Sequence, residues 1–150
     1  MIKDIKDQYQ LIRLDNVKVV EQWNDLEQVI VDSFAHIKSE WNEEEKAKLL
    51  KHIADERIQC WGIFKDKELT AFATTALLTE FWGERRLLIF SLYGFNKINI
   101  DVWRNLFSSL RKYAKSERCT KIVAFTTNKR IIQICKSIGG TFSAFIEMEI

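Results

Sequence analysis

The chain has no proline, only five glycines and no long hydrophobic run. Without Pro-, Gly- or Ser-rich stretches, no segment has the composition of a linker or a low-complexity tract. No stretch approaches the ~18 consecutive apolar residues that a membrane span requires. With 150 residues, of which 47% are hydrophobic and 29% charged, the chain suits one domain with a buried core. We therefore expect a single soluble domain over residues 1–150, with no membrane partner.

Neither sign of charge dominates the sequence. There are 23 Lys and Arg residues against 21 Asp and Glu, and they are interspersed. Nucleic-acid-binding proteins usually carry a basic block or stripe, so we expect no nucleic-acid partner. Cys60, Cys119 and Cys135 are an odd number without metal-ligand spacing, and the N-terminus lacks an apolar signal core. These features predict no metal site, and a location in the cytoplasm or in a particle assembled there.

Hydrophobic periodicity predicts one strand and two helices in the first third of the chain. Residues 9–14 alternate roughly between apolar and polar, which is typical of a strand. Asn16 can then cap a helix that continues to about Ser39. Asn42 and Glu45 have the form of a capping box at the start of a second helix. The expected buried faces comprise Val19, Trp23, Leu26, Ile30, Phe34 and Ile37 in the first helix, and Leu49, Leu50, Ile53 and Ala54 in the second.

Three strands that pair antiparallel are expected next, over residues 59–64, 69–81 and 86–93. Residues 87–93 of the third strand are apolar at nearly every position. A strand of this kind is typical of the centre of a sheet that is covered on both faces. Helices are therefore expected on each side of the sheet.

The remaining elements are a helix over residues 101–117, a buried strand over 121–126, a helix capped by Asn128 and an alternating strand over 141–150. The apolar face of the first of these helices comprises Val102, Trp103, Leu106, Phe107, Leu110, Tyr113 and Ala114. The fold class is therefore α/β (α+β), with a mixed central sheet of about six strands flanked by helices. The order of elements is β-α-α-β-β-β-α-β-α-β.

This order, with these lengths, resembles the GNAT superfamily of N-acetyltransferases over nearly the entire chain. The most specific local match is residues 101–115, which are similar to the family's helix after its fourth strand and include its tyrosine-alanine pair. Residues 127–132 and 136–139 look like the family's Asn-x-x-Ala-Ile segment and the glycine-terminated end of its last helix. The resemblance implies a GNAT-like domain and acetyl-CoA as the cofactor.

One segment departs from the family's pattern. In the family, Arg/Gln-x-x-Gly-x-Gly/Ala lets backbone N–H groups and a helix N-terminus approach the CoA pyrophosphate. The matching positions here are Ile98, Asp101 and Trp103. Ile98 lacks the usual cationic or amide contact, Asp101 can bring an anion to the helix end, and Trp103 is bulky. Apart from the family, Asp101 is interpreted as a helix N-cap and Trp103 as the first large residue of a buried face.

Residues for proton transfer are also not in the expected places. The resemblance puts Cys135 where the family frequently has a general-acid tyrosine, but Cys135 lies on an apolar helix side and is interpreted as a packed thiol. The central strand carries no carboxylate, which leaves Glu80 and Glu84 at its entrance as the nearest general-base candidates. His36 and His52 have no metal-ligand company and are interpreted as structural.

Two classes of function follow. The preferred one is a catalytically degenerate GNAT-like domain that is not an enzyme, binds no cofactor and acts as a structural or interaction protein. It would be similar to small GNAT-like proteins of bacteriophages, some of them virion components. Its edge strand over 141–150 would add to a partner protein or to a second copy. The alternative is a divergent N-acetyltransferase that acts on a small amine or on a protein N-terminus or lysine. It would hold acetyl-CoA through backbone groups at 97–101, with Ile98, Asp101, Trp103 and Asn128 as the cofactor-site residues.

Overall fold

The computed structural model describes residues 9–94, 98–126, 128–144 and 146–150. They form a single α/β domain around one mixed sheet of five strands in the order β1-β2-β3-β4-β5. The first four strands pair antiparallel in sequence, and β5 pairs parallel with β4. The strands are β1 (Tyr9–Leu14), β2 (Ile58–Lys65), β3 (Glu68–Thr79), β4 (Arg85–Tyr93) and β5 (Lys121–Ala124).

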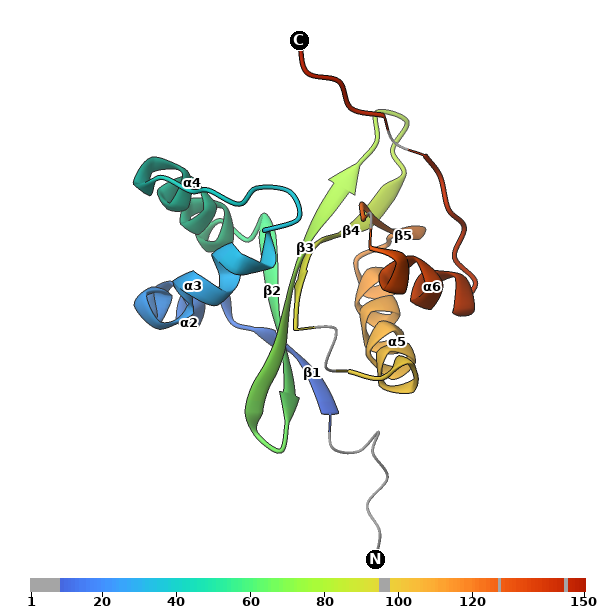
Figure 1. Ribbon diagram of the computed structural model, residues 1–150, viewed down its shortest axis with the longest axis horizontal. Helices are drawn as coiled ribbons and strands as arrows, with labels where there is room; N and C mark the ends of the chain where they lie inside the picture. The colour runs from blue at the N-terminus through green and yellow to red at the C-terminus, as the bar shows by residue number, and fades with distance from the viewer. Residues whose placement is uncertain (1–8, 95–97, 127, 145) are drawn as a thin grey trace, which may run out of the picture.

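Helices cover both faces of the sheet, as the apolar β4 sequence predicts. On one side lie α2, α3 and α4, and on the other α5 and α6 (Figure 1). Each side has its own hydrophobic cluster, one centred on Phe72, Ile30 and Ile53, the other on Trp61, Trp103 and related residues. The helices are α2 (Asn16–Glu21), α3 (Trp23–Ser33), α4 (Glu43–Ala54), α5 (Ile100–Ser116) and α6 (Lys129–Ser137).

The prediction of one continuous helix from Asn16 to Ser39 is wrong, because the chain forms two helices there. Asp15 caps α2, and its side chain accepts from the N–H groups of Val17 and Lys18. Asn16 is instead buried, and its amide Nδ2 donates to the carbonyl oxygen of Ile53 at 2.5 Å. A single residue separates α2 from α3, so the hydrophobic period continues across the break and hides it.

The expected buried face of these helices is confirmed in part, since Trp23 and Leu26 are only half-buried and pack against the hydrophobic cluster. Val19, Ile30 and Phe34 are buried, whereas Ile37 lies beyond the end of α3 and is 54% exposed. In α4 the predicted capping box is present, with Asn42 and Glu45 bonding each other's backbone N–H groups. Its buried residues are Leu49 and Ile53, while Leu50 is half-buried and Ala54, at the last position, is exposed.

The amphipathic pattern of α5 is confirmed. Six of the seven expected apolar positions are buried, and Tyr113 is half-buried. The Tyr113 ring contacts Trp61 of β2 edge to face, with 5.0 Å between centroids. This helix is therefore fixed to the sheet along its whole length by aromatic and aliphatic contacts.

Asn128 caps α6 as predicted, since its side chain accepts from the N–H groups of Arg130 and Ile131. The helix ends in a Schellman motif. Gly139 has a φ of 95°, which favours glycine, and the N–H of Gly140 donates to the Cys135 carbonyl at 2.8 Å.

The prediction of a strand over 141–150 is wrong for the described residues 141–144 and 146–150. They pair with no strand and are exposed, and they run along the outside of the domain to the C-terminus (Figure 1). Alternating apolar and polar residues predict an extended conformation, but a strand also needs a neighbour for its backbone groups. The described sheet accordingly has five strands instead of about six.

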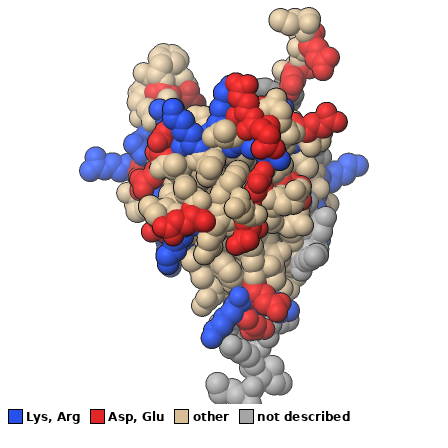
Figure 2. Space-filling view, turned by 90° about the vertical axis from the view of Figure 1, so that its left-hand side faces the viewer, with Lys and Arg blue, Asp and Glu red and all other residues tan. Residues whose placement is uncertain are grey.

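The surface carries both signs of charge. On the face formed by α2, α3 and α4, Lys and Arg lie among Asp and Glu without a large block of one sign (Figure 2). No helix in the described part of the chain is long and apolar enough to cross a membrane.

Candidate functional site: a crevice between β4 and β5

The two parallel strands β4 and β5 pair over only four residues. Their register runs from Arg86 opposite Lys121 to Ile89 opposite Ala124. Beyond Ile89, β4 continues to Tyr93, but the described part of the chain places no strand on that edge. In open α/β sheets, ligands bind in the crevice outside the carboxyl ends of the strands, and this is such a place.

A bulge in β4 lies at the point where the pairing stops. Thr74 of β3 pairs with Ser91 and Thr75 with Ile89, so Phe90 is an extra residue in β4. The Phe90 ring lies 5.1 Å from the ring of Phe34 at the end of α3. Ser91, the next residue, also contacts the end of α3, through Ser33. The bulge thus turns two consecutive side chains toward α3, which regular alternation would not allow.

A cavity of about 330 Å³ opens at this bulge, and we refer to it as the β4/β5 crevice. Its first wall is the end of β4, from Ile89 to Gly94, and its second is the chain from Ala124 to Thr126 with the start of α6. Asp32, Ser33, Ala35 and His36, at and after the end of α3, form its third wall.

Three buried hydroxyl groups form a chain beside the crevice. The Thr74 Oγ1 lies 2.6 Å from Ser91 Oγ, which lies 2.8 Å from Ser33 Oγ. Ser33 Oγ donates to the carbonyl oxygen of Ile30 at 2.6 Å. All three residues are almost completely buried, and Ser33 and Ser91 line the crevice.

The ionisable side chains that line the crevice within the described part of the chain are Asp32, His36 and Tyr93. Asp32 Oδ1 accepts a hydrogen bond from Gln28 Nε2 at 2.8 Å. Sequence reasoning interpreted His36 as structural and did not single out Asp32. In the sequence, Asp32 and His36 are polar residues between the expected buried positions Ile30, Phe34 and Ile37, a pattern that does not identify a site.

The start of α5 differs from the expectation for Asp101. Asn99 is the N-cap, with its side chain accepting from Val102 N at 3.0 Å, so the N-cap prediction for Asp101 is wrong. Asp101 lies in the first turn, where its exposed carboxylate pairs with Arg104 at 3.3 Å. Both Asn99 and Asp101 are good capping residues, and the sequence places them only two positions apart.

Ile98 and Trp103, which flank this turn, belong to the core. They are 1% and 3% exposed, which confirms Trp103 as a large residue of the buried face. The carbonyl of Ile98 accepts from Arg130 Nη2 of α6 at 2.8 Å. The Trp103 indole therefore packs in the hydrophobic cluster between α5 and the sheet and does not project from the N-terminus of α5.

Of the four residues expected at a cofactor site, only Asn128 lines the β4/β5 crevice. Position 97, which begins the expected backbone segment 97–101, lies outside the described residues.

Cys135 does not line the crevice. It packs against the hydrophobic cluster on the α5 side, and burial raises the pKa of its thiol above the ordinary value. A raised pKa keeps the sulfur protonated, which suits a packed thiol better than a nucleophile. Within the described part of the chain, no group of three or more His, Cys, Asp or Glu residues could hold a metal ion.

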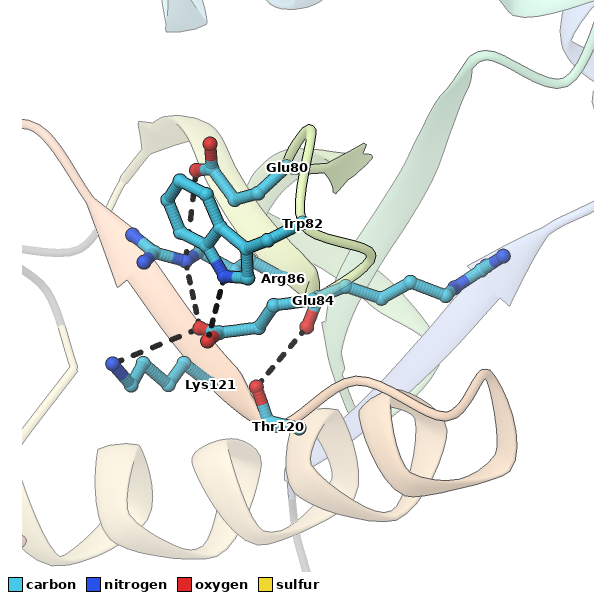
Figure 3. Close-up of polar contacts among 7 residues, drawn as sticks. Glu80, Trp82, Glu84, Arg86, Thr120 and Lys121 are labelled. Carbon is cyan, nitrogen blue, oxygen red and sulfur yellow. Dashed lines mark hydrogen bonds and ion pairs between the residues drawn. The ribbon is translucent and has the colours of Figure 1, made fainter.

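Glu80 belongs to a charge cluster at the opposite end of β4 (Figure 3). Arg86 Nε lies 3.7 Å from Glu80 and 3.0 Å from Glu84, and Lys121 Nζ lies 3.6 Å from Glu84. The Trp82 indole N–H, with Arg86 and Lys121, holds the pKa of the Glu84 carboxyl below its usual range. Since a strand rises about 3.3 Å per residue, the three residues from Arg86 to Ile89 separate this cluster from the nearest wall of the crevice by roughly 10 Å. Neither Glu80 nor Glu84 lines the crevice.

No family model matches the chain, and no curated protein matches it. Solved structures with the same fold do match. One is an aminoglycoside acetyltransferase, meta-AAC0020, from an uncultured soil metagenomic sample in complex with sisomicin. It is 10% identical with a TM-score of 0.72, over 98% of this chain and 97% of that one.

Two further structures agree. A predicted acetyltransferase with acetyl-CoA from Clostridium acetobutylicum is 14% identical, with a TM-score of 0.67 over 94% and 96% of the two chains. A ribosomal-protein-alanine N-acetyltransferase from Brucella melitensis biovar Abortus 2308 is 13% identical, with a TM-score of 0.66 over 95% and 97%. At these identities the likeness concerns the fold. The chain therefore has the fold of the GNAT acetyltransferases.

Proposed function

We propose that this chain is an acetyl-CoA-dependent N-acetyltransferase, and that the β4/β5 crevice is its active site. The observation that carries the proposal is the separation of β4 from β5 at the Phe90 bulge, which opens a cavity of about 330 Å³ at the carboxyl ends of two parallel strands. Structures with this fold include a predicted acetyltransferase with acetyl-CoA and an aminoglycoside acetyltransferase in complex with sisomicin. We therefore prefer an N-acetyltransferase to the catalytically degenerate domain that the sequence favoured.

The residues of the crevice fit the acyl-carrying arm of acetyl-CoA. That arm is uncharged and extended and contains amide groups. In the described structure, residues 91–93 of β4 pair with β3 on one side only. The backbone groups of an unpaired strand edge can bond an extended ligand as another strand would. When bound, acetyl-CoA would supply an acetyl group activated as a thioester.

The chain's own side chains would have two tasks at this site. Ile89, Leu92 and Ile131 provide apolar surface that excludes water from the acyl group. The end of α3 brings the polar groups of Asp32, Ser33 and His36 to the same cavity, and the amine acceptor would enter from this side.

Thermal unfolding with acetyl-CoA tests the proposal. A ligand at about 100 times its dissociation constant adds about 2.7 kcal/mol to the free energy of unfolding. For a chain of this size, that corresponds to a rise in Tm of about 5–11 °C. Release of the CoA thiol on addition of amines would then show transfer. No change in Tm at millimolar acetyl-CoA would contradict the proposal.

A second candidate is the degenerate domain with a structural or interaction role. It is favoured by the start of α5, where Asn99 already bonds Val102 N and Asp101 adds a carboxylate. A helix whose first N–H groups are capped has fewer left for a phosphate. Under this candidate acetyl-CoA would not bind. The resemblance to bacteriophage and virion proteins stays a prediction that no comparison tests.

A further inference from the structure

Positive charge is concentrated in the layer formed by α5 and α6. Residues 98–140 contain nine Lys and Arg against two Asp and Glu, a net charge of +7. Residues 15–57, which form the α2–α4 layer on the other face of the sheet, contain eleven Asp and Glu against six Lys and Arg. The net charge of +2 for the whole chain therefore averages over two layers of opposite sign.

Few of the positive charges in the α5 and α6 layer are neutralised by carboxylates. Asp101 pairs with Arg104 at 3.3 Å, and Glu117 pairs with Arg85 of β4 at 3.7 Å, so both acidic side chains are already engaged. Seven exposed cations of this layer have no ion pair with a carboxylate among the described residues, and we refer to them as the basic face. They are Arg111, Lys112, Lys115, Arg118, Lys129, Arg130 and Lys136.

Two hydrogen bonds bring these cations to one surface. Arg130 Nη2 of α6 donates to the carbonyl oxygen of Ile98, just before α5, at 2.8 Å. Arg111 Nη2 of α5 donates to the carbonyl oxygen of Ile138, just after α6, at 2.9 Å. The two helices therefore lie side by side on the same face of the sheet (Figure 1). Since a carbonyl oxygen carries no net charge, both guanidinium groups are held in place and keep their full positive charge.

The exposed side chains of α5 and α6 indicate which partner this face fits. Apart from Ile100, at the first position of α5, they are polar or charged. Protein interfaces have an apolar or aromatic core, and helices on a membrane surface insert apolar side chains. Single-stranded nucleic acids stack on several aromatic rings, whereas Phe142, 5.9 Å from Lys136 Nζ, is a single ring. The phosphate backbone of a duplex requires only cations and polar hydrogen-bond donors.

The extent of the basic face suits a short stretch of DNA duplex. Lys129 and Lys136 are separated by seven residues of helix, which is about 10 Å at a rise of about 1.5 Å per residue. Double-stranded DNA carries one charge per about 1.7 Å of its axis, so a stretch of this length presents roughly six phosphates on its two strands. Double-stranded RNA is recognised across about 16 base pairs, a longer span than α6 offers.

We propose that the basic face binds the phosphate backbone of double-stranded DNA without reading its sequence. The balanced charge of the whole sequence predicts no nucleic-acid partner, because it does not distinguish the two layers. The proposal does not depend on acetyl transfer, since no residue of α5 lines the β4/β5 crevice.

Fluorescence anisotropy of a labelled DNA duplex, titrated with the protein at several salt concentrations, tests the proposal. If four to seven of the cations contact phosphates, the logarithm of the binding constant should fall with the logarithm of the salt concentration at a slope of about −4 to −6. The affinity should then drop about 10²- to 10⁴-fold between about 50 and 200 mM salt, and a second duplex of unrelated sequence should bind equally. No binding at about 50 mM salt, or a slope near zero, would overturn the inference.

Two double variants locate the contact. Lys112→Ala with Lys115→Ala removes two exposed cations from α5 and should make the slope shallower by about 2. Lys48→Ala with Lys51→Ala removes the same charge from exposed positions of α4, on the other face of the sheet, and should leave the slope unchanged. All four positions are exposed, so the Tm of both variants should stay close to that of the wild type. Equal effects of the two variants on the slope would overturn the basic face as the site.

Other polyanions separate the remaining partners, again without acetyl-CoA in the titration. Binding of polyglutamate as tight as that of the DNA duplex would assign the face to acidic proteins instead. Equally tight binding of vesicles containing phosphatidylserine would assign it to an anionic membrane surface. Tighter binding of single-stranded DNA or of duplex RNA would also overturn the inference, whereas a preference for the DNA duplex over all four would support it.

Discussion

In the hydroxyl chain, Ser33 Oγ donates its proton to the Ile30 carbonyl, so Ser91 must donate to Ser33 and Thr74 to Ser91. This direction predicts unequal costs for removing the members of the chain. Ser91→Ala deletes the middle group and leaves the Thr74 proton without its acceptor in a fully buried position. Thr74→Val deletes the first donor and leaves only an unused lone pair on Ser91. If the chain ran the other way, Thr74 would be the acceptor, and replacing it would leave the Ser91 proton unpaired.

The magnitudes follow from burial. A buried donor left without a partner costs about 1–3 kcal/mol, whereas Thr74→Val leaves no proton unpaired and loses one hydrogen bond, whose net contribution is about 0.5–1.5 kcal/mol. Thr74, Ser91 and Ser33 are 0%, 1% and 1% exposed, so water cannot easily replace the lost partner. We expect Ser91→Ala to lower the free energy of unfolding by at least about 1 kcal/mol more than Thr74→Val.

Urea unfolding at 25 °C measures this difference, with Ser108→Ala as the control. Ser108 is an exposed position on α5, so its replacement should change stability by no more than about 0.5 kcal/mol. A loss in Thr74→Val equal to or larger than that in Ser91→Ala would refute the assigned direction of donation.

Three further predictions concern pH, charge and assembly. Burial raises the pKa of the Cys60 thiol to about 12. The stability that comes from burying the neutral Cys60 thiol is therefore fully present below the unfolded thiol pKa of about 8.5, and it is lost as pH rises toward 12. Urea unfolding at pH 7.5 and 10 should show a loss about 2 kcal/mol larger in the wild type than in Cys60→Ala, and equal losses would contradict this. Asp101→Asn removes an exposed anion from the start of α5 and should tighten acetyl-CoA binding up to about fivefold at low salt, less at high salt; weaker binding would show the charge argument wrong. Deleting residues 145–150 should lower the mass seen by light scattering if this segment adds to a partner copy, and an unchanged mass would end that hypothesis.

Much of the fold could be predicted because apolar periodicity is a local property of the sequence. The buried face of α5 and the capping box at Asn42 follow from residues three or four positions apart. The same property conceals the break at Gln22, since the apolar stripe continues across it. It also predicts a strand over 141–150, where apolar and polar residues alternate, but the described residues 141–144 and 146–150 pair with no strand.

The crevice could not be predicted in the same way. It depends on an extra residue, Phe90, which is visible only in the register of two strands. Its hydroxyl chain joins Ser33 to Ser91, 58 positions apart, and Ser91 to Thr74, 17 positions apart. The family resemblance directed attention to the start of α5 instead, where Trp103 proves to be a core residue.

The central claim is that acetyl-CoA binds in the β4/β5 crevice, and a calorimetric titration with two matched variants tests it most directly. Ala35 is exposed and lines the crevice, while Ala54 is exposed at the end of α4 and does not. Ala35→Trp should fill the crevice and abolish binding, and Ala54→Trp should bind acetyl-CoA as the wild type does. Equal binding by all three proteins would place the ligand elsewhere, and binding by none would refute the claim.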